Sequence, residues 1–347
     1  MTFTIGIPVH NGARYLRSAL NSAISQLRPA DEILVIDDAS TDGTAELLQS
    51  GEYQKKIRLL QNAAPTGFVD AWNRVIEHSA SDFVAILHQD DLLDPHYLQH
   101  IESALNLFPH ARHFYVGYTV IDHEGKELHT SPLPHSSNPI LFPGKEYAHR
   151  YLKGVLANAH IHRCPGVMTE RKLLLEKCSY RKEAGLIADD DFFLRVGEFT
   201  DVVGISRPLS SFRIHRDSAT GRLASLSHKL SEDYTFQTRY YRSHQSILDD
   251  ADVRLIEAQA IRFINSYLLE SVLREDSRAI GEAKKLRADF EGMLPGYFRQ
   301  RSAIMMNAIW RMVDRTLPGS VVLSALSRGM SLFLWLKKTL LPQRTEQ

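Results

Sequence analysis

A pair of adjacent aspartates, Asp90 and Asp91, follows the strand-like apolar run 83–87 and the residues His88 and Gln89. Neighbouring carboxylates repel each other, so placing both in one tight turn is costly unless a cation binds there. A divalent ion such as Mg²⁺, held by one or two carboxylates and by substrate phosphates, removes that repulsion. The alternative is structural, because either aspartate could cap the helix that follows.

A second pair, Asp37 and Asp38, follows the apolar run 33–36. A carboxylate at a strand end can accept the N3–H of a uracil-type base or the hydroxyl groups of a ribose. Residues 38–43 also make a good turn and helix cap without any ligand. Taken alone, this pair favours turn chemistry somewhat over a nucleotide contact.

Three consecutive aspartates, Asp189, Asp190 and Asp191, precede the helix-like run 192–196. The positive end of a helix dipole explains one carboxylate at this place, but it is a weak explanation for three. One of them can serve as a general base, which removes a proton from a hydroxyl group within hydrogen-bond reach.

A basic segment beyond Pro208 contains Arg213, His215 and Arg216. A neutral imidazole can ligate a metal ion, and arginines can pair with the oxygens of a diphosphate. A lone histidine is more often an ordinary surface or core residue, so this segment alone indicates little.

These side chains need a sheet to bring them together, and the first half of the chain alternates strand-like and helix-like segments. The expected strands are 3–9, 32–36, 57–60 and 83–87, and the expected helices are 15–27, 44–50 and 68–78. Such alternation is typical of a largely parallel sheet with helices on both faces. Ligands bind beyond the carboxyl ends of strands in such sheets, which is where the polar clusters stand.

The pattern is mixed from residue 95 to about residue 216 and helical after residue 218. Helices are expected at 98–108, 146–156, 169–178 and 192–199, strands at 113–121 and 202–206, and a long loop at 130–143. After Ser218 the periodicity is helical almost throughout. The sequence therefore predicts an α/β domain over 1–220 and a helical C-terminal region over 221–347.

Composition excludes several other classes of protein. The 347 residues carry 41 basic and 41 acidic side chains, so bulk charge does not indicate a nucleic-acid binder. Two cysteines are too few for a disulfide framework or a cysteine-based zinc site, which favours a cytoplasmic setting. The N-terminal residues resemble a strand rather than a signal peptide, and no uncharged apolar stretch reaches the ~18 residues of a spanning helix.

The order and spacing of the motifs over residues 3–217 resemble family-2-type inverting glycosyltransferases of the GT-A fold. The matching segments are 5–12, 33–44, Asn62, Gly67, 73–74, 83–91, 189–195 and 213–215. The form of the motif at residues 88–93 resembles that of enzymes of bacterial surface-polysaccharide assembly. The resemblance implies a Rossmann-like sheet in which residues 1–92 bind a nucleotide-sugar and residues 93–220 shape the acceptor site.

The resemblance also implies a role for each matching residue. The donor-binding residues it implies are Pro8, Val9 and His10 around the base, Asp38 on the base, Asp90 on the ribose, Gly67, and Arg213 near the diphosphate. The metal ligands it implies for Mg²⁺ or Mn²⁺ are Asp91 and His215. The catalytic base it implies is Asp189, six residues before Arg195, with Asp190 or Asp191 in that role if the register shifts.

This sequence departs from the family pattern at three places. Gln89 stands where the family most often has a carboxylate, which leaves one fewer acidic side chain for a metal ion. Ala188 replaces a frequent glutamate before the base, and Trp72 replaces an arginine that is often found there. These changes weaken the expected hold on the metal and on the diphosphate.

The implied reaction transfers a sugar, with inversion, from a nucleotide-sugar to a hydroxyl group of a glycan or lipid-linked saccharide. UDP is the expected nucleotide because Asp38 suits uracil, although a thymine base offers the same N3–H. Two other functions stay open. One is a sugar-nucleotide nucleotidyltransferase, although its usual Gly-rich loop is missing after the first strand, and the other is a non-catalytic nucleotide- or glycan-binding module.

The C-terminal segment 299–338 admits two interpretations. Its interleaved basic and apolar residues suit a peripheral anchor at the inner face of the cell membrane, close to a lipid-linked acceptor. They suit equally well a helical subdomain that packs on the core or on a partner chain. The sequence does not specify the sugar, the acceptor, the linkage or the oligomeric state.

Overall fold

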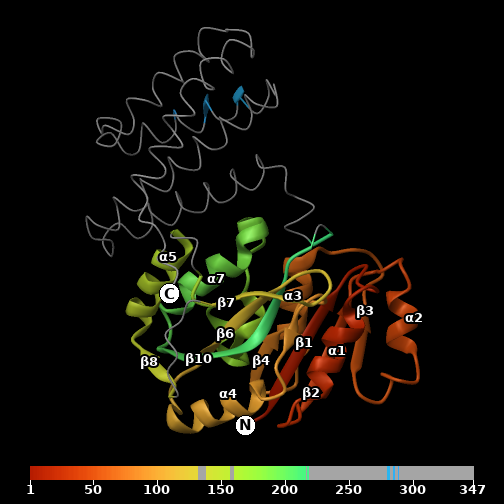
Figure 1. The fold of residues 1–347 in the computed structure, drawn as a ribbon, viewed down its shortest axis with the longest axis horizontal. Helices are drawn as coiled ribbons and strands as arrows, with labels where there is room; N and C mark the ends of the chain where they lie inside the picture. The colour runs from red at the N-terminus through yellow and green to blue at the C-terminus, as the bar shows by residue number, and fades with distance from the viewer. Residues whose placement is uncertain are drawn as a thin grey trace. The chain divides into compact units, whose positions relative to one another are not determined.

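The computed structural model describes residues 1–131, 138–156, 160–215 and 217–218, together with 280, 281, 284, 285 and 288. Its main feature is one sheet in the order β3-β2-β1-β4-β9-β6-β10-β5, with β7 paired to β6 and β8 paired to β10. Figure 1 shows helices packed against this sheet. Residues 1–218 all belong to one of the two compact units of the chain, and the following paragraphs concern that unit.

The N-terminal part of the sheet is wholly parallel. Its strands are β3 (Arg58–Gln61), β2 (Glu32–Asp37), β1 (Phe3–Val9) and β4 (Phe83–Ile86), and its helices are α1 (Leu16–Ile24), α2 (Thr44–Gln49) and α3 (Phe68–His78). A helix follows each of β1, β2 and β3 and returns the chain to the start of the sheet, which keeps neighbouring strands parallel. The carboxyl ends of these strands therefore lie at one edge.

Helices cover both faces of this part of the sheet because β1 alternates its side chains between the faces. Ile5 and Ile7 share a core with residues of α1 and of α4 (Tyr97–Leu107). Gly6 points to the other face, where an added Cβ would lie 2.0 Å from the Cγ1 atom of Val75 in α3. Glycine at this position therefore allows α3 to approach the sheet closely.

The second half of the sheet is mixed. Strand β9 (Val167–Glu170) pairs antiparallel with both β4 and β6 (His113–Ile121), and β10 (Val202–Arg213) runs parallel to β6. The other elements are β5 (Leu92–Leu93), β7 (Glu127–Thr130), β8 (Ile140–Phe142), α5 (Gly144–Leu156), α6 (Arg171–Glu176) and α7 (Ala188–Val196), with 3-10 turns at Cys164–Gly166 and Lys182–Ile187. Two reversals between β4 and β6 bring the carboxyl ends of β6 and β10 to the same edge as those of β1, β2 and β4.

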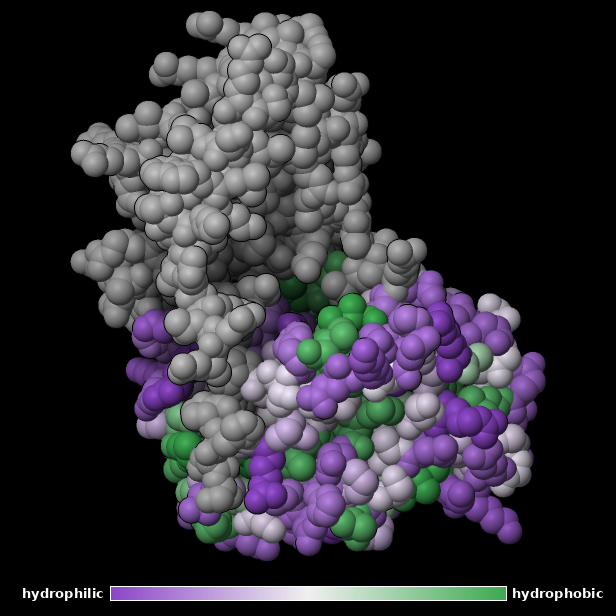
Figure 2. Space-filling model, viewed as in Figure 1, coloured by the Kyte–Doolittle hydropathy of each residue, from purple (hydrophilic) through white to green (hydrophobic). Residues whose placement is uncertain are grey.

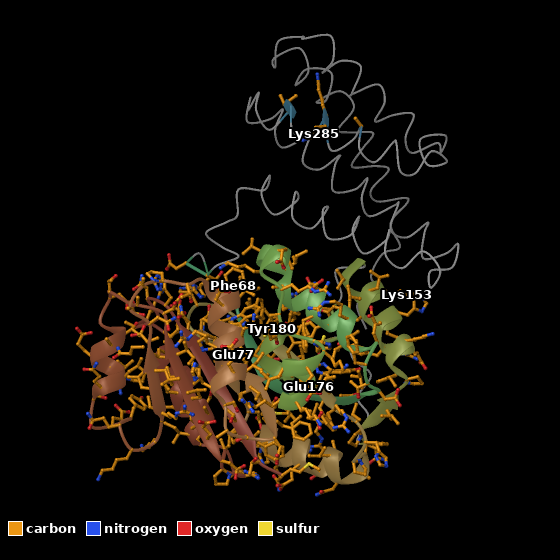
Figure 3. All side chains as sticks on the ribbon, turned by 180° about the vertical axis from the view of Figure 1, so that it is seen from behind. Phe68, Glu77, Lys153, Glu176, Tyr180 and Lys285 are labelled. Atoms are coloured by element: carbon orange, nitrogen blue, oxygen red, sulfur yellow. The ribbon has the colours of Figure 1, made fainter. Side chains whose placement is uncertain are left out.

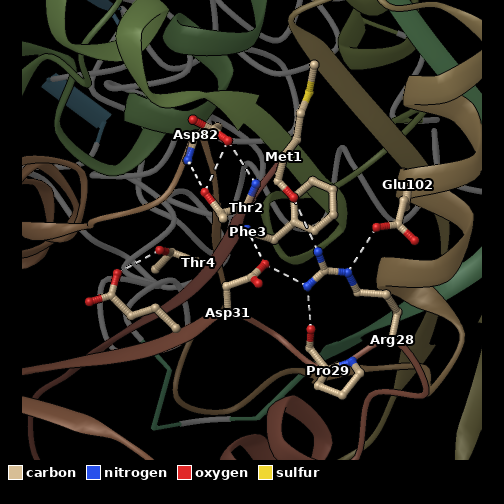
Figure 4. A network of polar contacts seen from close by, with 10 residues as sticks. Met1, Thr2, Phe3, Thr4, Arg28, Pro29, Asp31, Asp82 and Glu102 are labelled. Atoms are coloured by element: carbon tan, nitrogen blue, oxygen red, sulfur yellow. Dashed lines mark hydrogen bonds and ion pairs between the residues drawn. The ribbon is translucent and has the colours of Figure 1, made fainter.

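A polar network fixes the opposite edge of the sheet, where the strands begin (Figure 4). The backbone N–H groups of Thr2 and Phe3 donate to Asp82 and Asp31, each over 2.8 Å. The guanidinium of Arg28 bonds to Asp31 over 2.6 Å and to Glu102 of α4 over 3.1 Å. These contacts set the relative positions of β1, β2, β4 and α4 without occupying the edge that carries the polar strand ends.

The predicted α/β fold class, with a mostly parallel sheet and helices on both faces, is confirmed, and the differences are local. The sequence predicts a helix over 169–178, but 167–170 form β9 and only Arg171–Glu176 is helical. Pairing of β9 with β4 and β6 outweighs the local helical periodicity there. Strand β10 continues past the predicted turn at Pro208, with register irregularities on both sides of that residue.

Two predicted segments fall partly or wholly outside the described residues. The predicted loop 130–143 contains β8, and its residues 132–137 lie outside the described part. The predicted helical region 221–347 also lies outside it, except for residues 280, 281, 284, 285 and 288, which are helical. The membrane and subdomain interpretations of 299–338 therefore stay predictions.

Three further features concern the cysteines, the helices and the surface of the described residues. Cys164 and Cys178 are both buried and form no disulfide. Among the helices of the described part, none combines the length and the apolar character needed to cross a membrane. Figure 2 shows that the described surface on this face is mainly hydrophilic, with apolar side chains scattered over it.

Two histidines are buried in an aromatic layer between β6 and α7. His113 and His162 are each 0% exposed, and their rings contact Phe193 of α7. His113 Nδ1 lies 2.7 Å from the hydroxyl of Thr169, and His162 Nε2 lies 2.7 Å from the hydroxyl of Tyr147. Burial lowers the pKa of His113 to about 3 and the pKa of His162 well below its usual value. Both rings are therefore neutral in the folded protein at neutral pH.

Acid should destabilise the protein through these histidines. Their folded-state pKa values lie below the unfolded value of 6.5, so the stability that the neutral rings provide is complete above pH 6.5 and is lost below it. Each histidine lowers the free energy of unfolding by about 1.4 kcal/mol for every pH unit below that value. Urea unfolding at about pH 7 and about pH 5 should show a smaller loss of stability in His162→Gln than in the wild type. The exposed control His123→Gln should lose as much as the wild type, and an equal loss in His162→Gln would refute this explanation.

Candidate functional site

The polar ends of β1, β2 and β4 meet at the carboxyl edge of the sheet. The backbone N–H of Asp38 donates to the carbonyl of Val9 over 2.8 Å, and His10 Nδ1 lies 2.7 Å from the carbonyl of Asp38. Pro8 and Val9 are buried within β1, whereas His10 is exposed. The structure thus brings together the four residues that the sequence predicts around the donor base.

Gln89 joins the end of β4 to the end of β1. Its Oε1 accepts a hydrogen bond from the backbone N–H of His10 over 2.8 Å, and its Nε2 donates to the carbonyl of His10 over 3.3 Å. An amide can accept and donate at once, whereas an ionised carboxylate only accepts. Gln89 therefore acts as a clamp between two strands, which is a structural reason for an amide at this position.

The carboxylate of Asp38 is buried and holds the loop 62–67. Its Oδ1 accepts hydrogen bonds from Asn62 Nδ2 over 2.6 Å and from the backbone N–H of Thr66 over 2.8 Å, and its Oδ2 accepts one from the N–H of Gly67 over 2.9 Å. Burial raises the pKa of Asp38, but these hydrogen bonds outweigh it and hold the pKa below its usual value. Gly67 has φ +95°, a conformation that favours glycine, directly before α3. The contact of Asp38 with a base stays a prediction.

Asp91 is a buried carboxylate with one unsatisfied oxygen. It is 1% exposed, and its Oδ1 accepts a hydrogen bond from the backbone N–H of Arg213 over 2.8 Å. Its Oδ2 lies 3.4 Å from His88 Nδ1 and has no hydrogen-bond partner within the described residues. Burial raises the pKa of Asp91 to about 6, although His88 opposes that rise. A buried oxygen of this kind is costly unless a ligand satisfies it.

Asp90, Arg213 and His215 form a second cluster against Tyr15. His215 Nε2 lies 2.8 Å from Asp90 Oδ2, and Arg213 Nε donates to the carbonyl of Asp90 over 2.8 Å. Burial raises the pKa of Asp90, but the bond to His215 outweighs it and lowers the pKa. The guanidinium of Arg213 lies 4.8 Å from the ring centroid of Tyr15, and the ring of His215 lies 4.6 Å from it.

This cluster refines the predicted roles. The structure brings His215 to Asp90 rather than to Asp91. The guanidinium of Arg213 already bonds to a backbone carbonyl and lies over the ring of Tyr15. His215 Nδ1 is buried without a hydrogen-bond partner in the described part, so it keeps one ring nitrogen available for a ligand. The metal role of His215, the ribose role of Asp90 and the diphosphate role of Arg213 stay predictions, and Arg216 lies outside the described residues.

The three consecutive aspartates at the start of α7 have different partners. Asp190 accepts a hydrogen bond from the hydroxyl of Tyr151 over 2.5 Å, and Asp191 pairs with Arg195 through two contacts of 2.7 Å. The carboxylate of Asp189 accepts only the backbone N–H of Asp190, over 3.0 Å, among the hydrogen bonds of the described residues. Asp189 is therefore the one of the three whose carboxylate has no side-chain partner in the described part, and its role as general base stays a prediction.

Asp189 has a partly buried and acidic environment. Burial raises the pKa of Asp189 to about 7, the charge of Asp190 raises it too, and His88 and Arg163 oppose the rise. The thiol of Cys164 is close enough to feel both carboxylates, because burial raises its pKa and the charges of Asp189 and Asp91 add to that rise. A carboxylate with a pKa near neutrality suits a general base that works at physiological pH.

An aromatic cluster packs against the ring of His88. Trp72 stacks on His88 with centroids 5.1 Å apart and an interplanar angle of 21°, and it meets Phe68 and Tyr180 edge-on. Figure 3 shows Phe68 at the start of α3, with Tyr180 beside that helix. In the sequence, Trp72 is notable only because it replaces an arginine that the family often has there. Its apolar spacing with Val69 and Ile76 on α3 is the one signal that it faces the protein interior.

The described residues hold no group of three or more His, Cys, Asp and Glu side chains arranged around a metal ion. Asp91 Oδ2 is a buried carboxylate oxygen without a hydrogen-bond partner in the described part. Mg²⁺ commonly binds through one or two carboxylates and takes its other ligands from substrate phosphates and water. The residues present therefore fit a metal that binds together with a diphosphate rather than a preformed metal cage.

Replacing Asp190 by asparagine should move the pH dependence of turnover. Asp190 places a negative charge beside Asp189, and its removal should lower the pKa of Asp189, which is about 7 in the native protein. A base works only when deprotonated, so the acidic limb of the kcat profile should shift to lower pH. The measurement is kcat from about pH 5 to about pH 9 for Asp190→Asn and for Glu124→Gln, an exposed charge-matched control. An unshifted acidic limb in Asp190→Asn would remove this assignment.

Residues 4–168 match the model of the family described as Glycosyl transferase family 2. An uncharacterized glycosyltransferase of Rickettsia conorii is 32% identical over 126 residues, which are 36% of this chain and 21% of that protein. The putative teichuronic acid biosynthesis glycosyltransferase TuaG of Bacillus subtilis is 32% identical over 85 residues, 24% of this chain and 34% of that protein. This chain thus spans a minor share of the length of both relatives.

Solved structures with a similar fold extend further along the chain. The S. aureus TarS structure has a TM-score of 0.58 at 15% identity and covers 85% of this chain and 50% of its own. The complex of S. aureus TarS 1–349 with UDP-GlcNAc has a TM-score of 0.52 at 14% identity, with 84% and 92% covered. At this level of identity the likeness concerns the fold.

Proposed function

We propose that this chain, whose residues 4–168 form a glycosyl transferase family 2 domain, transfers a sugar from a nucleotide-sugar to a hydroxyl group in polysaccharide biosynthesis. The observation that carries the proposal is the arrangement at the sheet edge. Within the described residues, the carboxylate of Asp189 has no side-chain partner, and Asp91 has a buried oxygen without a hydrogen bond. The first is suited to take a proton, and the second is suited to a cation that accompanies a diphosphate.

The proposed reaction is a single displacement with inversion at the anomeric carbon. The acceptor hydroxyl oxygen forms the new bond to that carbon, and the bond from the carbon to the diphosphate oxygen breaks. Asp189 receives the hydroxyl proton, and the electron pair of the broken bond leaves with the nucleoside diphosphate. The raised pKa of Asp189, about 7, makes its carboxylate a stronger base than an exposed aspartate.

Mg²⁺ or Mn²⁺ is the proposed cofactor, with Asp91 Oδ2 as its protein ligand and His215 Nδ1 as a second candidate. A bound divalent ion would neutralise the charge that develops on the leaving diphosphate. The N–H of Arg213 holds the other oxygen of Asp91, and His88, which stacks on Trp72, lies 3.4 Å from Oδ2. These contacts would orient the carboxylate toward a metal ion.

A UDP-sugar is the proposed donor. Support comes from the carboxylate of Asp38 at the end of β2 and from a neighbour in fold, S. aureus TarS 1–349, which binds UDP-GlcNAc. Asp38 and the loop 62–67 that it holds would line the base, and Pro8, Val9 and His10 would complete the pocket. Asp90 would contact the ribose, with its orientation set by His215.

The proposed acceptor is a glycan or a lipid-linked saccharide of a bacterial surface polysaccharide. The name of the relative TuaG, a putative glycosyltransferase of teichuronic acid biosynthesis, supports this class of acceptor. We extend the proposal to a cytoplasmic enzyme that contacts the inner face of the membrane peripherally through residues 299–338. A truncation before residue 299 that leaves the membrane-bound fraction unchanged would argue against that contact.

Thermal unfolding with a panel of nucleotides tests the donor directly. UDP and UDP-sugars should raise the Tm more than the corresponding GDP, ADP and CMP compounds, and they should do so more strongly with Mn²⁺ present. A shift from a GDP-sugar alone would replace the UDP assignment. No shift from any nucleotide, with or without Mn²⁺, would remove the nucleotide-sugar site.

A further inference from the structure

The guanidinium of Arg163 has no polar partner in the described part of the chain. Its Nε is buried and makes no hydrogen bond, and no ion pair involves this side chain there. The buried arginines Arg195 and Arg213 behave differently, since each is held by a carboxylate or by backbone carbonyls. A half-buried guanidinium without such partners is a group that a ligand can satisfy.

Aromatic rings set the position of Arg163 instead. Its guanidinium carbon lies 5.7 Å from the ring centroid of Tyr118 on β6 and 5.1 Å from that of Phe212 on β10. Both rings are fixed by the sheet, and the hydroxyl of Tyr118 donates to the carbonyl of His160 over 3.1 Å. Stacking on ring faces restrains the cation while leaving the edge of the planar fork free for hydrogen bonds.

The rings that hold Arg163 come from the part of the chain that is predicted to shape the acceptor site. Tyr118 and Phe212 belong to β6 and β10, which come from the part of the chain beyond residue 93. Side chains alternate along a strand, so Phe212 and Arg213 point to opposite faces, and Arg213 is the one that meets the Asp90 turn. Arg163 also lies within electrostatic reach of Asp189.

We infer that Arg163 binds an oxyanion, a phosphate or carboxylate, carried by the acceptor next to the hydroxyl that Asp189 activates. An anionic acceptor is otherwise repelled by the carboxylates of Asp189 and Asp190. The guanidinium fork offers two parallel N–H donors that match either oxyanion, and pairing there would orient the acceptor as well as hold it. This inference rests on the proposed function, because it assigns the class of acceptor for the same site.

Binding measurements with small anions test the inference without requiring turnover. Calorimetric titrations of glycerol 3-phosphate, glucuronate and UDP would be compared for the wild type, Arg163→Gln and Arg163→Lys. The control is Arg112→Gln, an arginine at the other end of β6 that pairs with Glu170. At least one of the two small anions should bind the wild type and Arg112→Gln alike and should bind Arg163→Gln roughly tenfold more weakly. The anion whose affinity decreases indicates whether the acceptor carries a phosphate or a carboxylate. The affinity of Arg163→Lys, which keeps the charge without the planar fork, should lie between those of the wild type and Arg163→Gln.

Three outcomes would overturn the inference. The first is that neither small anion binds the wild type, and the second is that the small anions bind Arg163→Gln as tightly as the wild type. The third is that Arg163→Gln loses affinity for UDP alone, which would assign Arg163 to the donor diphosphate. Circular dichroism and the Tm of each variant separate a binding loss from a folding loss, and Arg163→Lys provides the answer if Arg163→Gln does not fold. The proposed function would fail by a different measurement, namely if the wild type released no nucleoside diphosphate from any nucleotide-sugar.

Discussion

Asp189→Asn should lower kcat by roughly 10²–10⁴-fold while leaving the fold and the affinity for UDP intact. The amide keeps the shape of the side chain and can still accept the N–H of Asp190, but it cannot take the proton of an acceptor hydroxyl. Because the lost contribution concerns proton transfer, KM for the donor should change little. The measurement is steady-state release of nucleoside diphosphate, with the Tm as a check on folding.

The neighbouring aspartates supply matched controls for this prediction. Asp190→Asn makes the same chemical change one residue later, where Tyr151 is the partner, and it should move the pH profile rather than abolish turnover. Asp191→Asn breaks the contact with Arg195 and should act mainly on stability. Near-normal kcat in Asp189→Asn, or a larger loss in Asp190→Asn, would transfer the role of base away from Asp189.

Asp91→Ala should lower turnover by about 100-fold or more and should abolish metal-dependent binding of UDP. The substitution removes the oxygen that has no partner in the described part, and it also removes the acceptor of the Arg213 N–H. Asp91→Asn separates these two effects, because its amide oxygen can still accept that N–H while its charge is lost. Both variants should therefore lose Mn²⁺ binding in the presence of UDP, and only the alanine variant should lose much stability.

Electron paramagnetic resonance of Mn²⁺ with UDP present measures this metal binding directly. The signal of free Mn²⁺ should decrease when wild-type protein is added and should persist when either Asp91 variant is added. The control is Asp94→Asn, three residues later, whose carboxylate accepts the backbone N–H of His96 directly before α4. Undiminished Mn²⁺ binding by Asp91→Asn would show that another residue holds the metal.

The sequence was sufficient for the parts of the fold that depend on local pattern. Apolar strands such as 3–9 and 83–87 end in polar residues, and this order predicts which side chains share the carboxyl edge. The four-residue spacing of Asp191 and Arg195 on one helix is likewise a local relation. Strand β9 escaped prediction because its neighbours β4 and β6 lie far away in sequence, and their pairing decides its conformation.

The partners of the site residues could not be read from the sequence. Asp38 is held by the loop 62–67, and His215 lies against Asp90, which is 125 positions earlier. Gln89 looked like a lost metal ligand, but its two hydrogen bonds to His10 give it a structural role. Each of these contacts depends on how distant turns meet in space, so only the structure shows which carboxylates are occupied and which oxygen stays available.

Release of nucleoside diphosphate from a panel of nucleotide-sugars is the measurement that tests the central claim most directly. Phosphorus NMR would follow wild-type protein and Asp189→Asn with each donor, with and without Mn²⁺, using water as the acceptor. The account predicts slow, Mn²⁺-stimulated release of UDP from a UDP-sugar by the wild type and almost none by Asp189→Asn. Release of UMP together with a sugar 1-phosphate, or no release from any donor, would contradict a glycosyltransferase centred on Asp91 and Asp189.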